Sequence, residues 1–230
     1  MRGKLFTGWL FGVMTVVGLL GAPLMLFGPR AVLPSVRLWV ASAIWGLRVL
    51  LGVRVEFRGL EHAPKGAALI AGKHMSMLDT LAPFRVLNYP CFVLKRELLS
   101  QPVFGAYMKA TRMIPIDREA HAAALRRMTA DARDRLAAGR QIIIFPEGTR
   151  QAPGAAPDYK PGVAALYREL GLPCHLLATN SGAHWPAQGT RFTPGVAVFE
   201  FLPPIPPGLK RGEFMRELER RLQDASNRLL

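Results

Sequence analysis

The sequence is short of acidic residues and of cysteine. Its 16 aspartates and glutamates face 30 lysines and arginines, which gives a net charge of +14. A surplus of this size favours a polyanionic partner, such as nucleic acid, anionic lipid or a phosphorylated substrate. The two cysteines, Cys91 and Cys174, lie in apolar, strand-like surroundings. We therefore expect small buried thiols and not acyl-carrying nucleophiles.

Two further kinds of site are missing from the sequence. Nucleic-acid binding needs a basic face interleaved with exposed aromatic residues, or a known module, and neither is present. No histidine lies at metal-ligand spacing from a cluster of Cys, Asp or Glu, so no metal and no cofactor is predicted. The histidines tested in this way are His62, His121, His175 and His184. The positive charge is therefore expected to serve a membrane and an anionic substrate, and no nucleic acid.

Charge is absent from residues 8–28. As a helix this stretch would extend about 31 Å, close to the hydrocarbon thickness of a bilayer. Pro23 lies inside it, so a kinked or re-entrant element fits as well as a clean span. A signal peptide is the alternative, but the apolar stretch is long for one and no small-x-small cleavage site follows.

A second apolar stretch, residues 36–53, is interrupted by Arg37 and Arg48. These arginines lie about three helical turns apart and point to nearly the same face, while the opposite face suits the headgroup layer. No acidic residue precedes Glu56, a bias that attracts anionic lipid and favours a cytoplasmic N-terminus. We therefore predict that residues 1–53 anchor the chain to the inner (cytoplasmic) membrane, spanning it or dipping into one leaflet. Residues 54–230 would then form one domain on the cytoplasmic face.

Strand-like and helix-like segments alternate through this domain. Their order predicts an α/β fold, with a mostly parallel sheet flanked by helices and an N-terminal two-helix membrane-anchoring motif. A proline-rich turn is expected at residues 202–207. The expected strands cover residues 53–57, 68–72, 91–95, 112–116, 141–144, 174–179 and 196–201, and the expected helices cover residues 76–86, 102–110, 119–138, 161–170 and 210–230.

The strand at residues 141–144 ends in a run of polar residues. Pro146 cannot donate to a sheet ladder, so the strand should stop there. Glu147-Gly148-Thr149-Arg150 then follows, and open α/β sheets place their ligands at such strand ends. Gly148 lets the backbone approach a ligand closely, and the guanidinium of Arg150 fits a phosphate or a carboxylate.

The strand at residues 68–72 ends just before His74, and Asp79 follows four intervening residues later. Together with Phe145-Pro146-Glu147-Gly148-Thr149-Arg150, this His-x4-Asp pair resembles the glycerolipid acyltransferase family, especially its bacterial 1-acyl-sn-glycerol-3-phosphate acyltransferases. The hexapeptide is much more specific than the pair, and the ordered likeness covers residues 68–182. Its other blocks are residues 94–98 with Pro102 and Gly105, residues 114–118, and residues 177–182.

The resemblance implies a membrane-bound acyltransferase that needs two substrates. A fatty acyl group would move from acyl-CoA or acyl-ACP, where ACP is acyl carrier protein, to the sn-2 hydroxyl of lysophosphatidate, giving phosphatidate. His74 would be the general base, because an unperturbed imidazole titrates near ~6.5. Asp79 would hold its other ring nitrogen. The acceptor hydroxyl would attack directly, so Ser76 is not expected to be a nucleophile.

The spacing of this pair constrains its geometry. In a regular helix, positions i and i+5 lie about 140° apart and do not face each other. His74 is therefore predicted in the strand-to-helix turn, with Asp79 in the first turns of the next helix. Ser76-x-x-Asp79 also matches a capping box, so Asp79 has a structural interpretation beside the catalytic one.

By the same resemblance, Glu147, Gly148, Thr149 and Arg150 surround the acceptor's phosphate, and Arg118 supplies a second positive charge. Lys95 would hold the phosphate or stabilise the thioester oxyanion, or else is a surface lysine. Backbone N–H groups near Gly148 are another candidate oxyanion site.

The chain departs from the family pattern at two positions. Lys73 stands where an asparagine commonly precedes the histidine, and Gln151 stands where a serine commonly follows the hexapeptide. Both differences bear on acceptor preference. Two alternatives to lysophosphatidate acylation stay open: acylation of another lyso-lipid such as lyso-ornithine lipid, and a non-catalytic membrane adaptor that keeps the fold. The intact His74, Asp79 and residues 147–150 argue against the adaptor.

Overall fold

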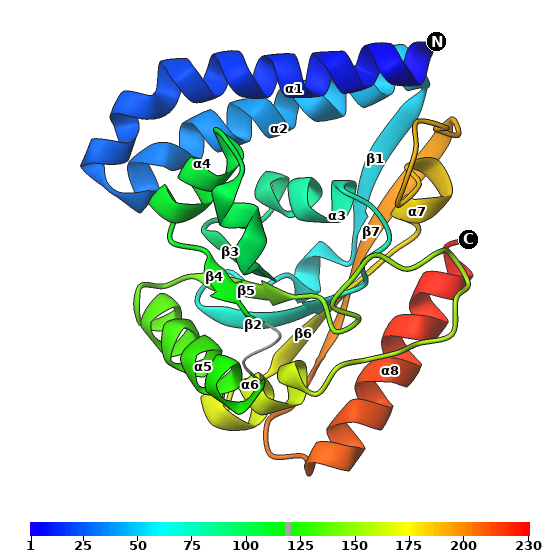
Figure 1. Cartoon of the computed structure of the whole chain (residues 1–230). Helices are drawn as coiled ribbons and strands as arrows, with labels where there is room; N and C mark the ends of the chain where they lie inside the picture. The colour runs from blue at the N-terminus through cyan, green and yellow to red at the C-terminus, as the bar shows by residue number, and fades with distance from the viewer. Residues whose placement is uncertain (118–120) are drawn as a thin grey trace.

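The computed structural model describes residues 1–117 and 121–230. Figure 1 shows a twisted central sheet between two long N-terminal helices and the C-terminal helix α8. In the described part of the chain, seven strands lie in the order β1-β7-β6-β2-β5-β3-β4. They are β1 (Val53–Arg58), β2 (Ala68–Gly72), β3 (Pro90–Lys95), β4 (Ile114–Ile116), β5 (Gln141–Ile144), β6 (Cys174–Thr179) and β7 (Gly195–Ile205).

Neighbouring strands run parallel, except that β6 and β7 are antiparallel. Every residue of β2 and β5 is buried, as expected of strands covered on both faces. The predicted α/β fold with a mostly parallel sheet is confirmed.

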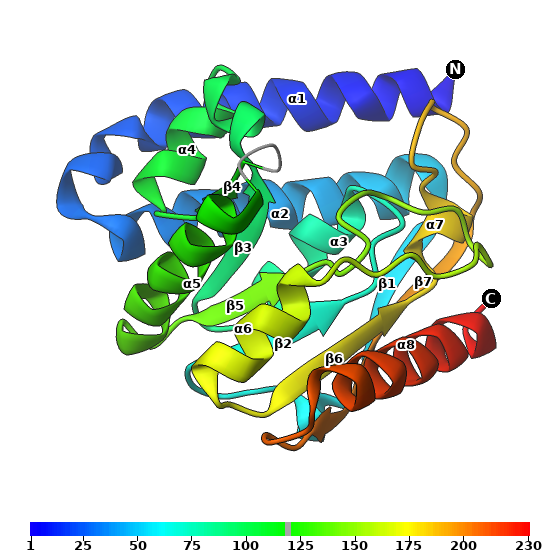
Figure 2. The same cartoon turned by 60° about the horizontal axis from the view of Figure 1, so that its bottom comes forward.

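Helices cover both faces of the sheet. In Figure 2, α5, α6 and α8 lie on one face, while α2 and α3 lie on the other, with α1 outside α2. The helices are α1 (Arg2–Gly21), α2 (Pro29–Leu51), α3 (Leu78–Leu81), α4 (Phe104–Ala110), α5 (His121–Ala137), α6 (Gly162–Leu170), α7 (Ser181–His184) and α8 (Arg211–Arg228); 3-10 turns are η1 (Ala22–Phe27), η2 (Leu60–His62), η3 (Ala82–Arg85) and η4 (Arg96–Ser100).

The two N-terminal helices form a hairpin that packs on the domain. By length and composition, both are apolar enough to cross a membrane. Half of the apolar window of α2 is buried, however, and Val36, Val40 and Leu47 join the same core as the sheet. Two hydrogen bonds to backbone oxygens of α1 add to this packing, from Trp39 Nε1 to Leu10 (3.0 Å) and from the Tyr107 hydroxyl to Gly18 (3.0 Å).

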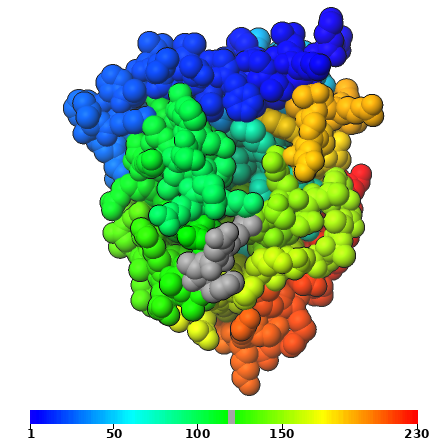
Figure 3. All heavy atoms as spheres, in the orientation of Figure 1, coloured from blue at the N-terminus to red at the C-terminus, as the bar shows by residue number. Residues whose placement is uncertain are grey.

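The outward side of the hairpin is strongly apolar. Figure 3 shows α1 running along one whole edge of the molecule. The residues exposed here include Leu5, Trp9, Phe11, Val16, Leu19, Leu20, Leu26, Phe27, Leu38, Trp45 and Val49. An exposed apolar surface of this kind marks a site of contact with a membrane or another protein.

Two predicted segments differ from the structure. Residues 202–207 were expected to form a turn, but β7 continues to Ile205. The pairing with β6 shifts register between Leu202 and Ile205, so Pro203 and Pro204 fall in a bulge, where a missing N–H costs no ladder bond. The helix expected at residues 76–86 is shorter, because α3 covers Leu78–Leu81 and passes into the 3-10 turn η3 at Ala82, just before Pro83.

Candidate active site

The parallel pairing of β2 and β5 brings two polar segments together. Ala71 lies opposite Ile144 in this ladder, so both strands end at the same edge of the sheet. Lys73 and His74 leave β2 there, and residues 145–150 leave β5. This edge is where ligands bind in open α/β sheets.

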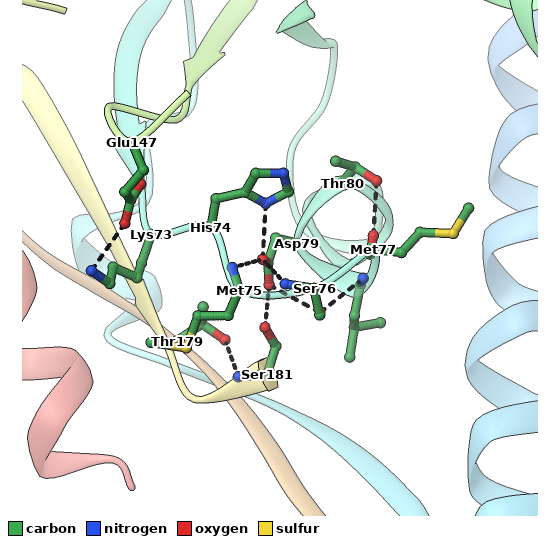
Figure 4. Close-up of polar contacts among 11 residues, drawn as sticks. Lys73, His74, Met75, Ser76, Met77, Asp79, Thr80, Glu147, Thr179 and Ser181 are labelled. Carbon is green, nitrogen blue, oxygen red and sulfur yellow. Dashed lines mark hydrogen bonds and ion pairs between the residues drawn. The ribbon is translucent and has the colours of Figure 1, made fainter. Parts of the chain in front are cut away.

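His74 lies in the turn after β2 and faces Asp79 in the first turn of α3, as the spacing predicts. Its Nδ1 is 3.1 Å from Asp79 Oδ2. Asp79 is an acceptor when ionised, so Nδ1–H donates and Nε2 keeps a free lone pair. Figure 4 shows the second ring nitrogen pointing away from Asp79. The His74 side chain is 16% exposed, compared with 2% for Asp79.

Two further contacts hold the histidine. Its ring stacks on Phe145, with centroids 4.1 Å apart and an interplanar angle of 13°. Its backbone oxygen accepts a hydrogen bond from Gln151 N (2.8 Å). The segment after β5 therefore supports the histidine on both its ring and its backbone.

Both oxygens of Asp79 accept hydrogen bonds. Besides His74, Oδ2 accepts the backbone N–H groups of Met75 (2.6 Å) and Ser76 (2.8 Å), while Oδ1 accepts the Ser181 hydroxyl. The Ser76 hydroxyl accepts Leu78 N–H (3.0 Å). Asp79 thus accepts the N–H of Ser76, which is the return half of the predicted capping box, and also contacts the His74 ring. The other half is not formed, because the Ser76 hydroxyl bonds the N–H of Leu78 and not that of Asp79.

Sequence reasoning missed the contribution of Ser181. The residue is fully buried at the start of α7, and its N–H donates to Thr179 Oγ1 (3.0 Å). It lies 102 residues from Asp79 along the chain. Its place in the block of family likeness at residues 177–182 was the available signal.

Lys73 and Glu147 form a second pair beside the first. Lys73 Nζ lies 3.0 Å from Glu147 Oε1, and the two side chains are 1% and 0% exposed. Burial raises the pKa of Glu147, and the nearby charges of Lys73 and His74 partly offset this rise. The carboxylate of Glu147 therefore faces Lys73 and not the solvent, which differs from its expected place around the acceptor's phosphate.

The rest of the hexapeptide forms a tight turn. Gly148 has φ of +68°, a conformation that favours glycine. Its N–H donates to Phe145 O (2.9 Å), so this N–H is already engaged and is not a ready oxyanion donor. Thr149 and Arg150 are exposed.

The predicted cationic residues lie near the same edge. Lys95 ends β3, which pairs with β5, and is exposed. Within residues 1–117 and 121–230, neither Lys95 nor Arg150 makes a side-chain hydrogen bond or ion pair. Both cations are therefore available to an anionic ligand. Arg118, the other predicted cation, lies outside the described residues.

The cysteines and possible metal ligands add no further chemistry at this edge. Burial raises the pKa of Cys91 to about 11 and that of Cys174 to about 12, so both are protonated thiols near neutral pH. Among the residues that the structure describes, no group of three or more His, Cys, Asp or Glu side chains is placed to hold a metal ion. Within the described residues, the arrangement is thus an imidazole oriented through Nδ1, with Lys95 and Arg150 lacking ion-pair partners near the same sheet edge.

Comparison with known proteins gives matches in one family. A model of the family described as Acyltransferase matches residues 54–179. The 1-acyl-sn-glycerol-3-phosphate acyltransferase of Pseudomonas aeruginosa is 38% identical over 157 residues, which cover 68% of this chain and 61% of the relative. The human 1-acyl-sn-glycerol-3-phosphate acyltransferase alpha is 31% identical over 163 residues, covering 70% of this chain and 58% of the relative.

The fold has a close match among solved structures. The crystal structure of a 1-acyl-sn-glycerophosphate acyltransferase from Thermotoga maritima superposes with a TM-score of 0.82 at 21% identity. The superposition covers 100% of this chain and 98% of the other. At this identity the likeness bears on the fold alone, and it includes the two N-terminal apolar helices.

Proposed function

Because the chain belongs to the glycerolipid acyltransferase family, we propose that it is a membrane-bound 1-acyl-sn-glycerol-3-phosphate O-acyltransferase. It transfers a fatty acyl group from a thioester donor to the sn-2 hydroxyl of lysophosphatidate and so makes phosphatidate. The acceptor is suggested by the names of the relatives, about three fifths of whose length this chain spans.

The observation that carries the proposal is the contact between His74 Nδ1 and Asp79 Oδ2. It leaves Nε2 as the acceptor for a proton. In the proposed reaction, Nε2 takes the proton of the sn-2 hydroxyl while that oxygen attacks the thioester carbonyl carbon. The tetrahedral intermediate then collapses, the carbon–sulfur bond breaks, and the imidazolium returns the proton to the departing thiolate. Asp79 stabilises the imidazolium and keeps the ring in place.

Acceptor binding is assigned to the cations at the same edge of the sheet. Arg150 follows the tight turn at Gly148 and is exposed without an ion-pair partner in the described part of the chain. A guanidinium binds phosphate through two parallel hydrogen bonds. Thr149 adds a hydroxyl beside it, and Lys95 and Arg118 are the proposed further cations.

The N-terminal hairpin is proposed to hold the enzyme at the cytoplasmic face of the inner membrane. Its exposed apolar side chains face away from the domain, while the inner side of α2 packs on the core. The arginines near the ends of the helices, such as Arg2, Arg30 and Arg48, would then meet anionic headgroups. The lipid acceptor reaches the site from this surface.

Acceptor and donor are tested with the purified full chain in detergent or liposomes. Labelled acyl-CoA and acyl-ACP are each offered with lysophosphatidate, other lysophospholipids and lyso-ornithine lipid, and the His74→Ala variant serves as the blank. We expect lysophosphatidate to be consumed and phosphatidate to form with at least one donor. Preferential acylation of lyso-ornithine lipid would replace the proposed acceptor, and no acylation of any acceptor by either donor would favour the adaptor.

A further inference from the structure

We propose that Lys73 is a positioning residue, and that Glu147 acts through it and not on the acceptor. The buried ammonium of Lys73 contacts the turn after β5, the loop that follows it and α8, and so fixes these segments next to His74. The effect on rate rests on the proposed function, whereas the effect on folding does not. We call Lys73, Glu147, Tyr159 and Gln223 the lysine cluster.

The contacts of Lys73 Nζ come from three separate parts of the fold. It lies 3.0 Å from Glu147 Oε1 and 2.8 Å from Gln223 Oε1 on α8. It also lies 5.5 Å from the ring centroid of Tyr159, within the range of a cation–π interaction. The ammonium is thus held by one hydrogen bond, one ion pair and one aromatic ring.

The same cluster fixes the loop that carries Thr149 and Arg150. Gln223 Nε2 donates to Ala155 O (3.2 Å), and Lys160 N donates to Pro146 O (2.8 Å). Gln151 N reaches the backbone oxygen of His74 (2.8 Å). Because Lys73 directly precedes His74, the loop is joined to the base at adjacent residues.

Figure 4 shows the side chains of Lys73 and His74 leaving the turn on different sides, toward Glu147 and Asp79 respectively. Glu147 is thereby kept away from the open side of the site. Its Oε2 is buried and has no hydrogen-bond partner in the described part of the chain. In the described part of the chain, Lys73 is the one side chain that forms an ion pair with this carboxylate, so its loss leaves Glu147 without an ion-pair partner.

The pair is tested by a double-mutant cycle of Lys73→Met, Glu147→Gln and the combined variant. Removing one partner of a buried ion pair is strongly destabilising, while replacing both by neutral groups is often tolerated. Lys73→Met is therefore expected to lower the unfolding temperature by on the order of 10 °C. Its kcat/KM should fall about 100-fold, the cost of a displaced site. The combined variant should recover most of both losses.

The pH dependence of unfolding shows whether Lys73→Met is destabilised by the unpaired charge of Glu147 or by lost packing. Without Lys73, the groups that act on Glu147 are His74 and Tyr159, and Glu219 acts on Tyr159 in turn. Burial holds the pKa of Glu147 above its ordinary value in the folded protein, so the unfolded chain releases that proton first as pH rises. Lys73→Met should therefore lose stability between the ordinary and the raised pKa, and the combined variant should lack this slope.

The unfolding temperature and kcat/KM are both measured on the full chain in detergent. Lys65→Met is the matched control, because Lys65 is exposed. Equal losses in Lys73→Met and the combined variant would overturn the proposal. So would a Glu147→Gln enzyme of normal unfolding temperature whose only defect is a raised KM for lysophosphatidate, since Glu147 would then bind the acceptor directly. If the unaltered protein acylates nothing, the proposed function is wrong. The unfolding temperatures of the double-mutant cycle still decide the structural role of Lys73.

Discussion

Adjacent residues at the end of β2 make two acid–base pairs that differ in their access to solvent. His74 pairs with Asp79 and keeps 16% of its side chain exposed, while Lys73 pairs with Glu147 and both side chains are fully enclosed. The two carboxylates differ as well. Asp79 accepts hydrogen bonds on both oxygens, whereas the Glu147 carboxylate is ion-paired with Lys73 through Oε1 and, among the described residues, its Oε2 has no hydrogen-bond partner.

This difference separates a group that can react from a group that supports it. A general base must reach the proton that it takes, so one nitrogen of His74 has to face outward. A buried ion pair cannot reach a substrate, but it joins segments that are distant in the sequence. Each pair should therefore respond to substitution in its own way: the His74–Asp79 pair through turnover, and the Lys73–Glu147 pair through folding and loop position.

The largest effect on turnover is expected when the His74–Asp79 pair is broken. His74→Ala removes the proposed base, so kcat should fall roughly 10²–10⁴-fold, the usual contribution of general-base catalysis. The unfolding temperature should change little, because Asp79 keeps its hydrogen bonds from Met75, Ser76 and Ser181. Initial rates with lysophosphatidate and thermal unfolding of the same preparation give both values.

Lys73→Met supplies the contrasting result, since it should lower both the unfolding temperature and the rate. A His74→Ala enzyme with near-normal turnover would remove His74 from the reaction. A large fall in the unfolding temperature of that variant would instead show that the His74–Asp79 pair, like the Lys73–Glu147 pair, stabilises the fold.

A smaller effect is expected from Arg150, on the loop that the buried pair holds. Arg150→Lys keeps the charge but loses one hydrogen bond of a bidentate phosphate contact. That bond is worth about 1.5–3 kcal/mol, which corresponds to a roughly ten- to hundredfold rise in the KM for lysophosphatidate. The KM for the acyl donor should hardly move. Steady-state kinetics with each substrate varied in turn make the measurement.

Arg168→Lys is a suitable control for Arg150, because Arg168 is an exposed arginine on α6. If the donor KM rises instead, Arg150 belongs to the donor site. An unchanged KM for the acceptor would point to an acceptor without a phosphate.

The smallest effect concerns Ser181, which completes the hydrogen bonding of Asp79. Among the described residues, Ser181→Ala leaves Asp79 Oδ1 with one hydrogen-bond partner, Ser76 Oγ at 3.5 Å. We expect kcat to fall about tenfold, in line with the loss of one hydrogen bond to a charged group, and the acceptor KM to stay unchanged. A thiol is a weaker hydrogen-bond donor than a hydroxyl, so the kcat of Ser181→Cys should lie between those of the unaltered enzyme and Ser181→Ala.

Ser100→Ala provides the baseline for these measurements, since Ser100 is exposed on η4. Equal rates for the alanine and cysteine variants would show that the hydroxyl fills space and does not orient Asp79. A fall confined to the unfolding temperature would lead to the same conclusion.

Much of the fold followed from short-range patterns. The strand at residues 174–179 was predicted with its observed ends, and the strand at residues 141–144 was expected to stop before Pro146, as it does. β7 was one exception, because the local sequence of Pro203 and Pro204 is typical of a turn. Only the register against β6 allows them in a strand.

The sequence by itself determined the order of the strands and helices, the edge of the sheet where polar residues gather, and the placement of His74 and Asp79 about one turn. These depend on residue periodicity and on turn chemistry over a few positions. Tertiary structure alone decided that Ser181 reaches Asp79 from 102 residues away and that Gln223 reaches Lys73 from 150 residues away. It also turned Glu147 inward, because a buried ammonium was the nearest group able to offset its charge.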